Sequence, residues 1–208
     1  MCSSGTYESI DFACLAASVR RILEVNRGLP ADRKIRVISM SIGWGPTSKG
    51  DQDIKAATAQ AKVEGLLVVC SSLEEVHGLK FHGLGRSPLS DPDRADSFSP
   101  GLWWAKSYFS GQRFSDRLLI PMDSRTTASP SGTDEYAFYR QGGWSWCIPY
   151  IAGLYALAAQ VDSSITPKEF WDTAVRTGKT IQVAEGAAQA TLGPIVDPVA
   201  LVNALQSK

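Results

Sequence analysis

The amino-acid sequence predicts an α/β fold with a mainly parallel sheet flanked by helices. Two short apolar segments rich in β-branched residues, 35–42 and 66–70, have the composition of buried strands. The segment between them, 51–64, is rich in alanine and favours a helix. A strand, a helix and a strand in this order predict a parallel pair joined by a crossover helix.

Two further helices have clear sequence signals. Apolar residues recur at three- and four-residue spacing over 12–23, which predicts an amphipathic helix that ends near Gly28. Thr166 and Glu169 have the spacing of a capping box, with Pro167 at the first helical position. They predict a helix that runs to about residue 177.

The remaining elements are predicted from composition. Residues 145–160 are apolar nearly all round, which is typical of a helix in the centre of a domain. Residues 199–205 follow an Asp-Pro start signal and should form the last helix. Residues 117–121 favour a short strand, and residues 124–134 a polar loop. The Gly-, Pro- and Ser-rich segment at about 75–116 is expected to be an ordered surface excursion with one strand pair, within a single domain 1–208.

Composition argues against several classes of function. The 208 residues have a formal net charge of +0, and a nucleic-acid-binding protein would need a basic patch. No apolar run reaches the roughly 20 residues that span a bilayer. The four cysteines form no CxxC pair and the two histidines no H-E-x-x-H motif, so we expect no metal and no cofactor. No signal peptide is visible, and the cellular location stays open.

The strongest candidate for chemistry is a serine at the start of the central helix, in the segment 143–153 (GWSWCIPYIAG). Ser145 in the first helical turn would feel the positive end of the helix dipole, and backbone N–H groups there could hold an oxyanion. Gly143 would let a substrate backbone approach. The alternative is an ordinary buried helix with a serine N-cap.

This segment resembles the nucleophile motif of the subtilisin-like serine protease (subtilase) family, G-T-S-M-A-x-P-x-V-A-G. The positions that match by type and spacing are Gly143, Ser145, Pro149, Ala152 and Gly153.

The order of the other elements resembles the same family. Its first helix is followed by a strand that ends in S-L-G, here Ser41-Ile42-Gly43. A helix and a strand of the pattern G-V-x-V-V follow, here 65–69, and the closing 193–198 resembles the last elements of the family.

The resemblance implies peptide-bond hydrolysis through an acyl-enzyme on Ser145, with a peptide or protein as substrate. Ser41, Ile42, Gly43 and Gly143 would then line the substrate cleft, where an extended peptide adds to the strand. Their alternative role is packing at the end of the strand.

The sequence departs from the family in its other catalytic positions. The family's Asp and His motifs precede the first helix, so the resemblance implies a partial domain without the first strands. His77 and His82 lie elsewhere, and neither is assigned as the base. Glu74 falls where the family's oxyanion asparagine belongs, and a neighbouring serine, Ser71 or Ser72, could donate in its place.

Three interpretations remain open from the sequence. The triad is completed by an N-terminal part of the same protease or by another subunit, or the chain is an inactive pseudoprotease that binds or regulates. The third interpretation is an unrelated α/β ligand-binding domain, which predicts no exposed serine at the helix start.

Overall fold

The computed structural model describes residues 10–112 and 114–207, and its contacts divide the chain into two compact units, residues 1–79 and 80–208. The predicted single domain 1–208 stays a prediction.

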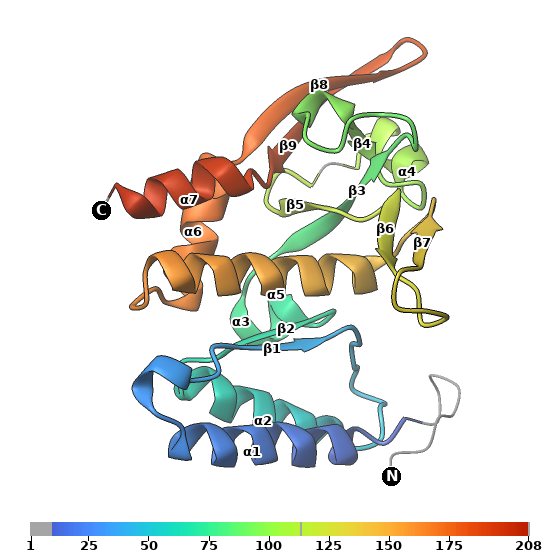
Figure 1. Cartoon of the computed structure of the whole chain (residues 1–208). Helices are drawn as coiled ribbons and strands as arrows, with labels where there is room; N and C mark the ends of the chain where they lie inside the picture. The colour runs from blue at the N-terminus through green and yellow to red at the C-terminus, as the bar shows by residue number, and fades with distance from the viewer. Residues whose placement is uncertain (1–9, 113, 208) are drawn as a thin grey trace. The chain divides into compact units, whose positions relative to one another are not determined.

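The first unit is a parallel strand pair with its crossover helix and the preceding helix α1. Its elements are α1 (Phe12–Gly28), η2 (Ala31–Arg33), β1 (Val37–Met40), α2 (Asp51–Val63), β2 (Leu67–Cys70) and α3 (Leu73–His77). β1 and β2 pair in parallel, with Ile38 opposite Val68, and α1 and α2 lie side by side (Figure 1). The predicted strands and both helices are thereby confirmed, with ends that differ by a residue or two.

Local signals explain why α1 forms where it does. The Asp11 side chain accepts a hydrogen bond from the Ala13 N–H, at 3.0 Å, and so caps the helix. Its apolar stripe is buried in a cluster with residues of α2 and of both strands. Burial of this stripe, more than helix propensity, stabilises a helix of this length.

The second unit contains a mixed five-stranded sheet. Its strands are β3 (Phe81–Arg86), β4 (Phe98–Pro100), β5 (Leu118–Pro121), β8 (Lys179–Glu185) and β9 (Ala188–Ile195), in the order β4-β3-β5-β9-β8. The inner pairs β3–β5 and β5–β9 are parallel, and the outer pairs β3–β4 and β8–β9 are antiparallel. The α/β class is confirmed, but a mainly parallel sheet is not, because an antiparallel strand closes each edge.

The remaining elements of this unit are η3 (Ala95–Ser97), α4 (Ala105–Phe109), β6 (Arg125–Ala128), β7 (Tyr136–Tyr139), α5 (Trp144–Val161), α6 (Pro167–Thr177) and α7 (Pro198–Gln206). α5 packs against β3 and β5, and α7 packs against α5 and α6 (Figure 1). The capping box of α6 is present, with the Glu169 N–H donating to Thr166 Oγ1 at 3.2 Å. The predicted helices 145–160, 166–177 and 199–205 are confirmed.

The segment 75–116, expected to be a surface excursion with one strand pair, contains the buried strand β3 near its start, and β3 pairs antiparallel with β4. β3 lies between β4 and β5, and its first five residues are buried. The glycines that suggested a loop are required by packing. A Cβ on Gly83 would lie 2.2 Å from the Met122 sulfur, and one on Gly85 would lie 2.6 Å from the Pro100 carbonyl oxygen.

Two hairpins replace segments that the sequence left irregular. The expected polar loop 124–134 contains β6, which pairs with β7 in an antiparallel hairpin. The strands β8 and β9 are joined by a two-residue turn in which Gly186 has a φ of 59°. Such short turns with a left-handed glycine are typical of β-hairpins.

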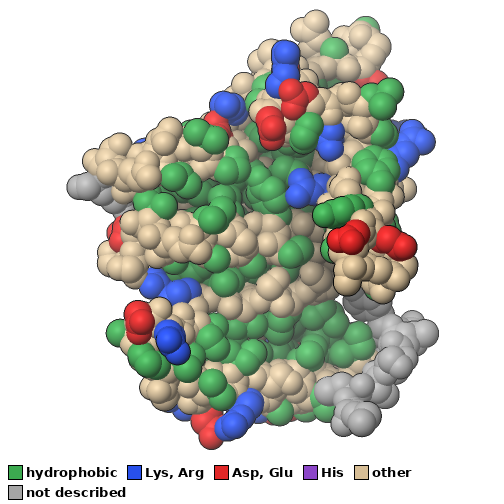
Figure 2. Space-filling view, viewed as in Figure 1, with side chains coloured by type: hydrophobic (Ala, Val, Ile, Leu, Met, Phe, Trp, Pro, Cys, Tyr) green, Lys and Arg blue, Asp and Glu red, His purple; other side chains and the backbone are tan. Residues whose placement is uncertain are grey.

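Charged side chains of both signs are interspersed on the face shown in Figure 2. Within residues 10–112 and 114–207, no helix is both long and apolar enough to span a bilayer.

Candidate active site around Ser145

Ser145 is the second residue of α5 and is exposed to solvent. The N-cap position belongs to Gly143, whose backbone is extended and which offers no side-chain cap. Ser145 is therefore not the N-cap serine that the ordinary explanation of the motif required. An exposed hydroxyl in the first turn also contradicts the expectation for an unrelated ligand-binding domain.

The two glycines before the helix are held by close contacts. A Cβ on Gly142 would lie 2.2 Å from the Met122 carbonyl oxygen, and one on Gly143 would lie 2.9 Å from the ring of Trp103. The indole of Trp103 is itself 61% exposed. The open side of Gly143 thus faces an aromatic ring, and its predicted contact with a substrate backbone stays a prediction.

A buried carboxylate that sequence reasoning missed anchors the segment before Ser145. Asp123 follows β5 and is 2% exposed. One of its carboxylate oxygens accepts a hydrogen bond from the Gly142 N–H at 2.8 Å, and the other from the Leu102 N–H at 2.9 Å. The sequence signal was an acidic residue two positions after a buried strand.

Cys147 is not a nucleophile in this arrangement. It is fully buried inside α5, and its thiol lies 3.8 Å from the Ile120 carbonyl oxygen. Burial raises the pKa of the thiol to about 12, so the reactive thiolate is absent at neutral pH. Cys14 and Cys70 are also free thiols, and Cys2 lies outside the described residues.

Three other residues of the motif, Pro149, Ala152 and Gly153, have different environments in α5. Pro149 is the sixth residue of α5 and lacks the N–H that would otherwise donate to the Ser145 carbonyl. Ala152 is buried, as expected of a residue that packs on the sheet. Gly153 is exposed, and a Cβ there would meet nothing within 4 Å. Gly153 therefore does not bring α5 into close contact with a neighbouring element.

His77 lies in α3 of the first unit and has a structural contact. Its Nε2 accepts a hydrogen bond from the Val68 N–H at 3.0 Å. Burial lowers the pKa of the imidazole to about 4. His77 is therefore neutral at pH 7 and holds the backbone of β2.

His82 lies in β3 of the second unit, among aromatic rings. Its imidazole stacks on Phe114 at 4.2 Å and meets Trp104 and Trp144 edge-on at 4.3 and 5.5 Å between ring centroids. The Gly83 N–H donates to Nδ1 at 2.9 Å, and burial lowers the pKa to about 4. His82 thus contacts the residue that precedes Ser145, but as a packed aromatic ring.

The predicted substrate-binding residues of the first unit, 41–43, directly follow the carboxyl end of β1 and contact Ser71 after β2. The Ser71 N–H donates to the Ile42 carbonyl at 2.9 Å, and a Cβ on Gly43 would lie 3.0 Å from the Ser71 Cβ. Ser41 is exposed. These contacts fit strand-end packing, and a role in substrate binding stays a prediction.

The two weak oxyanion candidates lie just beyond β2. The Ser72 hydroxyl accepts from the Trp44 N–H at 3.2 Å and donates to the Trp44 carbonyl at 3.3 Å. Glu74 is exposed on α3. Ser72 and Glu74 belong to the first unit and Ser145 to the second, so an oxyanion role for either stays a prediction.

The part of the chain that the structure describes holds no group of three His, Cys, Asp or Glu side chains placed to bind a metal ion.

The fold is similar to that of subtilisin-like proteases. Solved structures of that class match nearly the whole chain, although no family model matches the sequence. No curated protein is matched by sequence.

Three solved structures illustrate the likeness. The self-cleaved protease domain of PatA is 15% identical with a TM-score of 0.53, and the match covers 99% of this chain and 72% of that domain. The prenylagaramide maturation protease PagA is 11% identical with a TM-score of 0.55, over 98% of this chain and 71% of that one. Fervidolysin from Fervidobacterium pennivorans, described as a keratinolytic enzyme related to subtilisin, is 14% identical with a TM-score of 0.55, over 91% of this chain and 28% of that one.

Proposed function

We propose that this chain is part of a subtilisin-like serine endopeptidase in which Ser145 is the nucleophile. The observation that carries the proposal is an exposed serine in the first turn of the central helix of a subtilisin-like fold. The positive end of the helix favours the negative charge that develops when the hydroxyl attacks a carbonyl.

The proposed reaction is peptide-bond hydrolysis in two steps. The Ser145 oxygen attacks the peptide carbonyl carbon and gives its proton to a base, and the amine leaves with that proton to form an ester on Ser145. Water then attacks the ester and gives a proton to the base; as the acyl–oxygen bond breaks, the base returns that proton to the Ser145 oxygen, and the acid is released. A histidine oriented by an aspartate would act as the base, and neither described histidine is assigned this role.

One observation favours the alternative of an inactive module that binds or regulates. Each described histidine has a ring nitrogen that accepts a backbone N–H, and each has a pKa lowered to about 4. Both are therefore used for packing. In this alternative, the Ser145 region would bind a peptide without cleaving it.

The test uses the longest protein encoded in the reading frame, treated with a fluorophosphonate and with casein. We expect stoichiometric labelling that maps to Ser145 and is lost with casein cleavage in Ser145→Ala. Cys147→Ala should retain both, because the thiol is buried and protonated.

A protein that is neither labelled nor active, but that binds casein peptides, would support the inactive module instead. Loss of activity in Cys147→Ala with retention in Ser145→Ala would overturn the assignment of the nucleophile.

A further inference from the structure

The second unit contains a cleft of about 610 Å³ that is lined by charged side chains, none of which has a role in the proposed protease reaction. Its walls come from the segment 92–98, from the ends of β5 and β9, from the starts of β6, β8 and α7, and from Tyr150 of α5. Four charged side chains line it: Asp93, Arg125, Lys179 and Asp197.

Two of these charges neutralise each other. The Lys179 ammonium lies 2.8 Å from the Asp197 carboxylate. Burial opposes ionisation of Asp197, but hydrogen bonds from Lys179 and from the Ala200 N–H lower its pKa. This ion pair also caps α7, so it is part of the wall of the cleft and is not available to a ligand.

Arg125 is the available cation. Its guanidinium lies over the ring of Tyr150, 5.2 Å from the ring centroid. No carboxylate among the residues that the structure describes forms a salt bridge with it. A guanidinium that contacts an aromatic ring still has N–H donors that can bind a planar anion.

The direction of Arg125 is set by the residue before it. Ser124 is buried and has a φ of 53°, which is uncommon for a side chain other than glycine. Its hydroxyl donates to the Arg86 carbonyl at 2.6 Å, and its N–H donates to the Arg140 carbonyl at 3.0 Å. Such a backbone conformation persists only where the surroundings hold it, and it fixes where the chain enters β6.

The Tyr150 hydroxyl adds a neutral donor to the same cleft. Burial raises the pKa of this phenol, so that it stays protonated across the physiological range. The exposed Asp93 carboxylate, by contrast, disfavours a dianion such as phosphate in the cleft.

We propose that this cleft binds a carboxylate, with the Arg125 guanidinium and the Tyr150 hydroxyl as donors. The ligand is the carboxylate of a peptide, either at its C-terminus or on an acidic side chain. The proposal does not depend on catalysis by Ser145.

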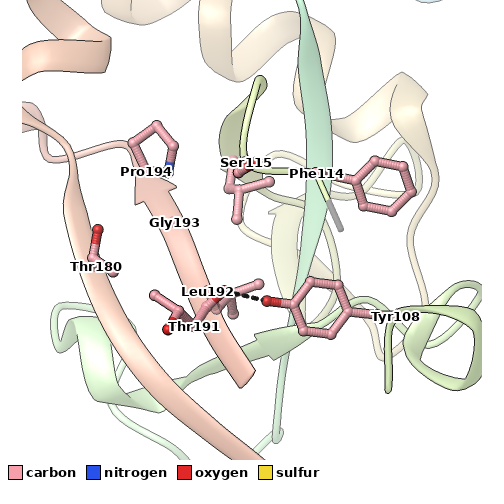
Figure 3. Close-up of a pocket in the computed structure, with 9 residues that line it drawn as sticks. Tyr108, Phe114, Ser115, Thr180, Thr191, Leu192, Gly193 and Pro194 are labelled. Carbon is pink, nitrogen blue, oxygen red and sulfur yellow. Dashed lines mark hydrogen bonds between the residues drawn. The ribbon is translucent and has the colours of Figure 1, made fainter. Parts of the chain in front are cut away.

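A second cleft in the same unit has no charged lining among the described residues and serves as a control site. It has a volume of about 490 Å³. Figure 3 shows Tyr108 and Phe114 on one side and Thr180, Thr191 and Pro194 on the other, with the Tyr108 hydroxyl donating to the Thr191 carbonyl. This uncharged cleft should not distinguish an acid from its amide.

The experiment titrates the ¹⁵N-labelled protein with acetyl-Ala-Ala-Ala and with the same peptide as its C-terminal amide. We expect the free acid alone to shift signals of Arg125 and Tyr150, while signals of Thr180 and Thr191 do not discriminate. Acetyl-Ala-Glu-Ala-amide identifies the source: binding equal to that of the free acid indicates side-chain recognition, and weaker binding indicates a terminal carboxylate.

Variants assign the binding to the cleft. Arg125→Gln should weaken binding of the acid by about tenfold or more, the effect of losing a charge-assisted hydrogen bond. Asp93→Asn should strengthen binding, because it removes a like charge from the cleft. Arg140→Gln is the matched control, since it removes the same charge from the same hairpin region outside the cleft and should change nothing.

Equal binding of acid and amide would overturn the proposal, as would wild-type affinity in a folded Arg125→Gln or no binding of either acidic peptide. Weakening by Arg140→Gln as large as that by Arg125→Gln would also overturn it, because the effect would then be one of overall charge.

Discussion

At the scale of single residues, the segment that leads to Ser145 is held by a buried carboxylate. Asp123 satisfies two backbone N–H groups from segments far apart in sequence, at Leu102 and Gly142. A carboxylate as buried as this one is retained only when its oxygens are hydrogen-bonded. It therefore fixes the segment that leads into α5.

We expect Asp123→Ala to lower the free energy of unfolding by about 2–4 kcal/mol, because it leaves two backbone donors, one of them buried, without an acceptor. Urea unfolding followed by tryptophan fluorescence measures the change. Asp134→Ala, at an exposed position, is the control and should stay within about 0.5 kcal/mol of the wild type. Equal effects of the two substitutions would show that Asp123 does not anchor this segment.

Because burial lowers the pKa of His77 and of His82, we expect the protein to lose stability in acid. In the unfolded chain, each takes up a proton near pH 6.5, whereas in the folded protein burial delays this to about pH 4. The unfolded state thus binds more protons between these values, and the free energy of unfolding must fall as the pH drops from 6.5 to 4.

Urea unfolding midpoints at several pH values across this window test the expectation. His77→Gln keeps an acceptor for the Val68 N–H without a titrating group and should make the pH dependence shallower. A profile as steep as that of the wild type would mean that His77 does not titrate in the way its burial implies.

At the scale of elements, β3 illustrates how glycine can belong to a buried strand. A Cβ on Gly85 would lie 2.6 Å from a backbone oxygen of β4, which cannot move aside as a side chain can. The antiparallel pairing of β3 with β4 therefore requires a residue without a side chain.

We expect Gly85→Ala to destabilise the protein by about 1–3 kcal/mol through overpacking. Gly153→Ala should instead stabilise it by about 0.5–1 kcal/mol, because Gly153 is exposed within α5 with open space around it. Thermal and urea unfolding of the two variants measure whether each change in the free energy of unfolding is positive or negative. Tolerance of Gly85→Ala would indicate that β4 is free to shift away from β3.

At the scale of the whole molecule, the subtilisin-like fold is retained at identities of 11–15% to the three structures compared. Such divergence shows that hydrophobic pattern and element order, rather than particular side chains, specify the arrangement. Hydrolysis of a peptide bond depends on a few catalytic side chains, and the fold does not by itself supply those side chains.

We expect the purified 208-residue chain to show no measurable cleavage of casein and no rapid labelling by a fluorophosphonate. A serine hydroxyl is a poor nucleophile at neutral pH without an adjacent base. Enzymes that have lost triad members retain only about 10³–10⁴-fold acceleration over water, which a routine assay does not detect. Rapid labelling of Ser145 together with cleavage would instead reveal a base within this chain, with His82 the first residue to substitute.

The sequence by itself determined the helices α1, α2 and α6 and the strands β1 and β2. Their signals are local: a periodic apolar stripe, a capping box, a short β-branched run. It also placed Ser145 at the start of α5, because the motif begins where the apolar run begins. The β8–β9 hairpin could have been predicted from the Gly186 turn.

Only the tertiary structure decided the place of β3, the mixed sheet and the roles of Asp123 and Arg125. Each depends on contacts between segments far apart in the chain, such as the approach of Gly85 to Pro100 or of Arg125 to Tyr150. A local pattern carries no information on which distant backbone or ring will fill the space beside a residue. The packing of the folded chain fixes those neighbours, and with them the chemistry of each site.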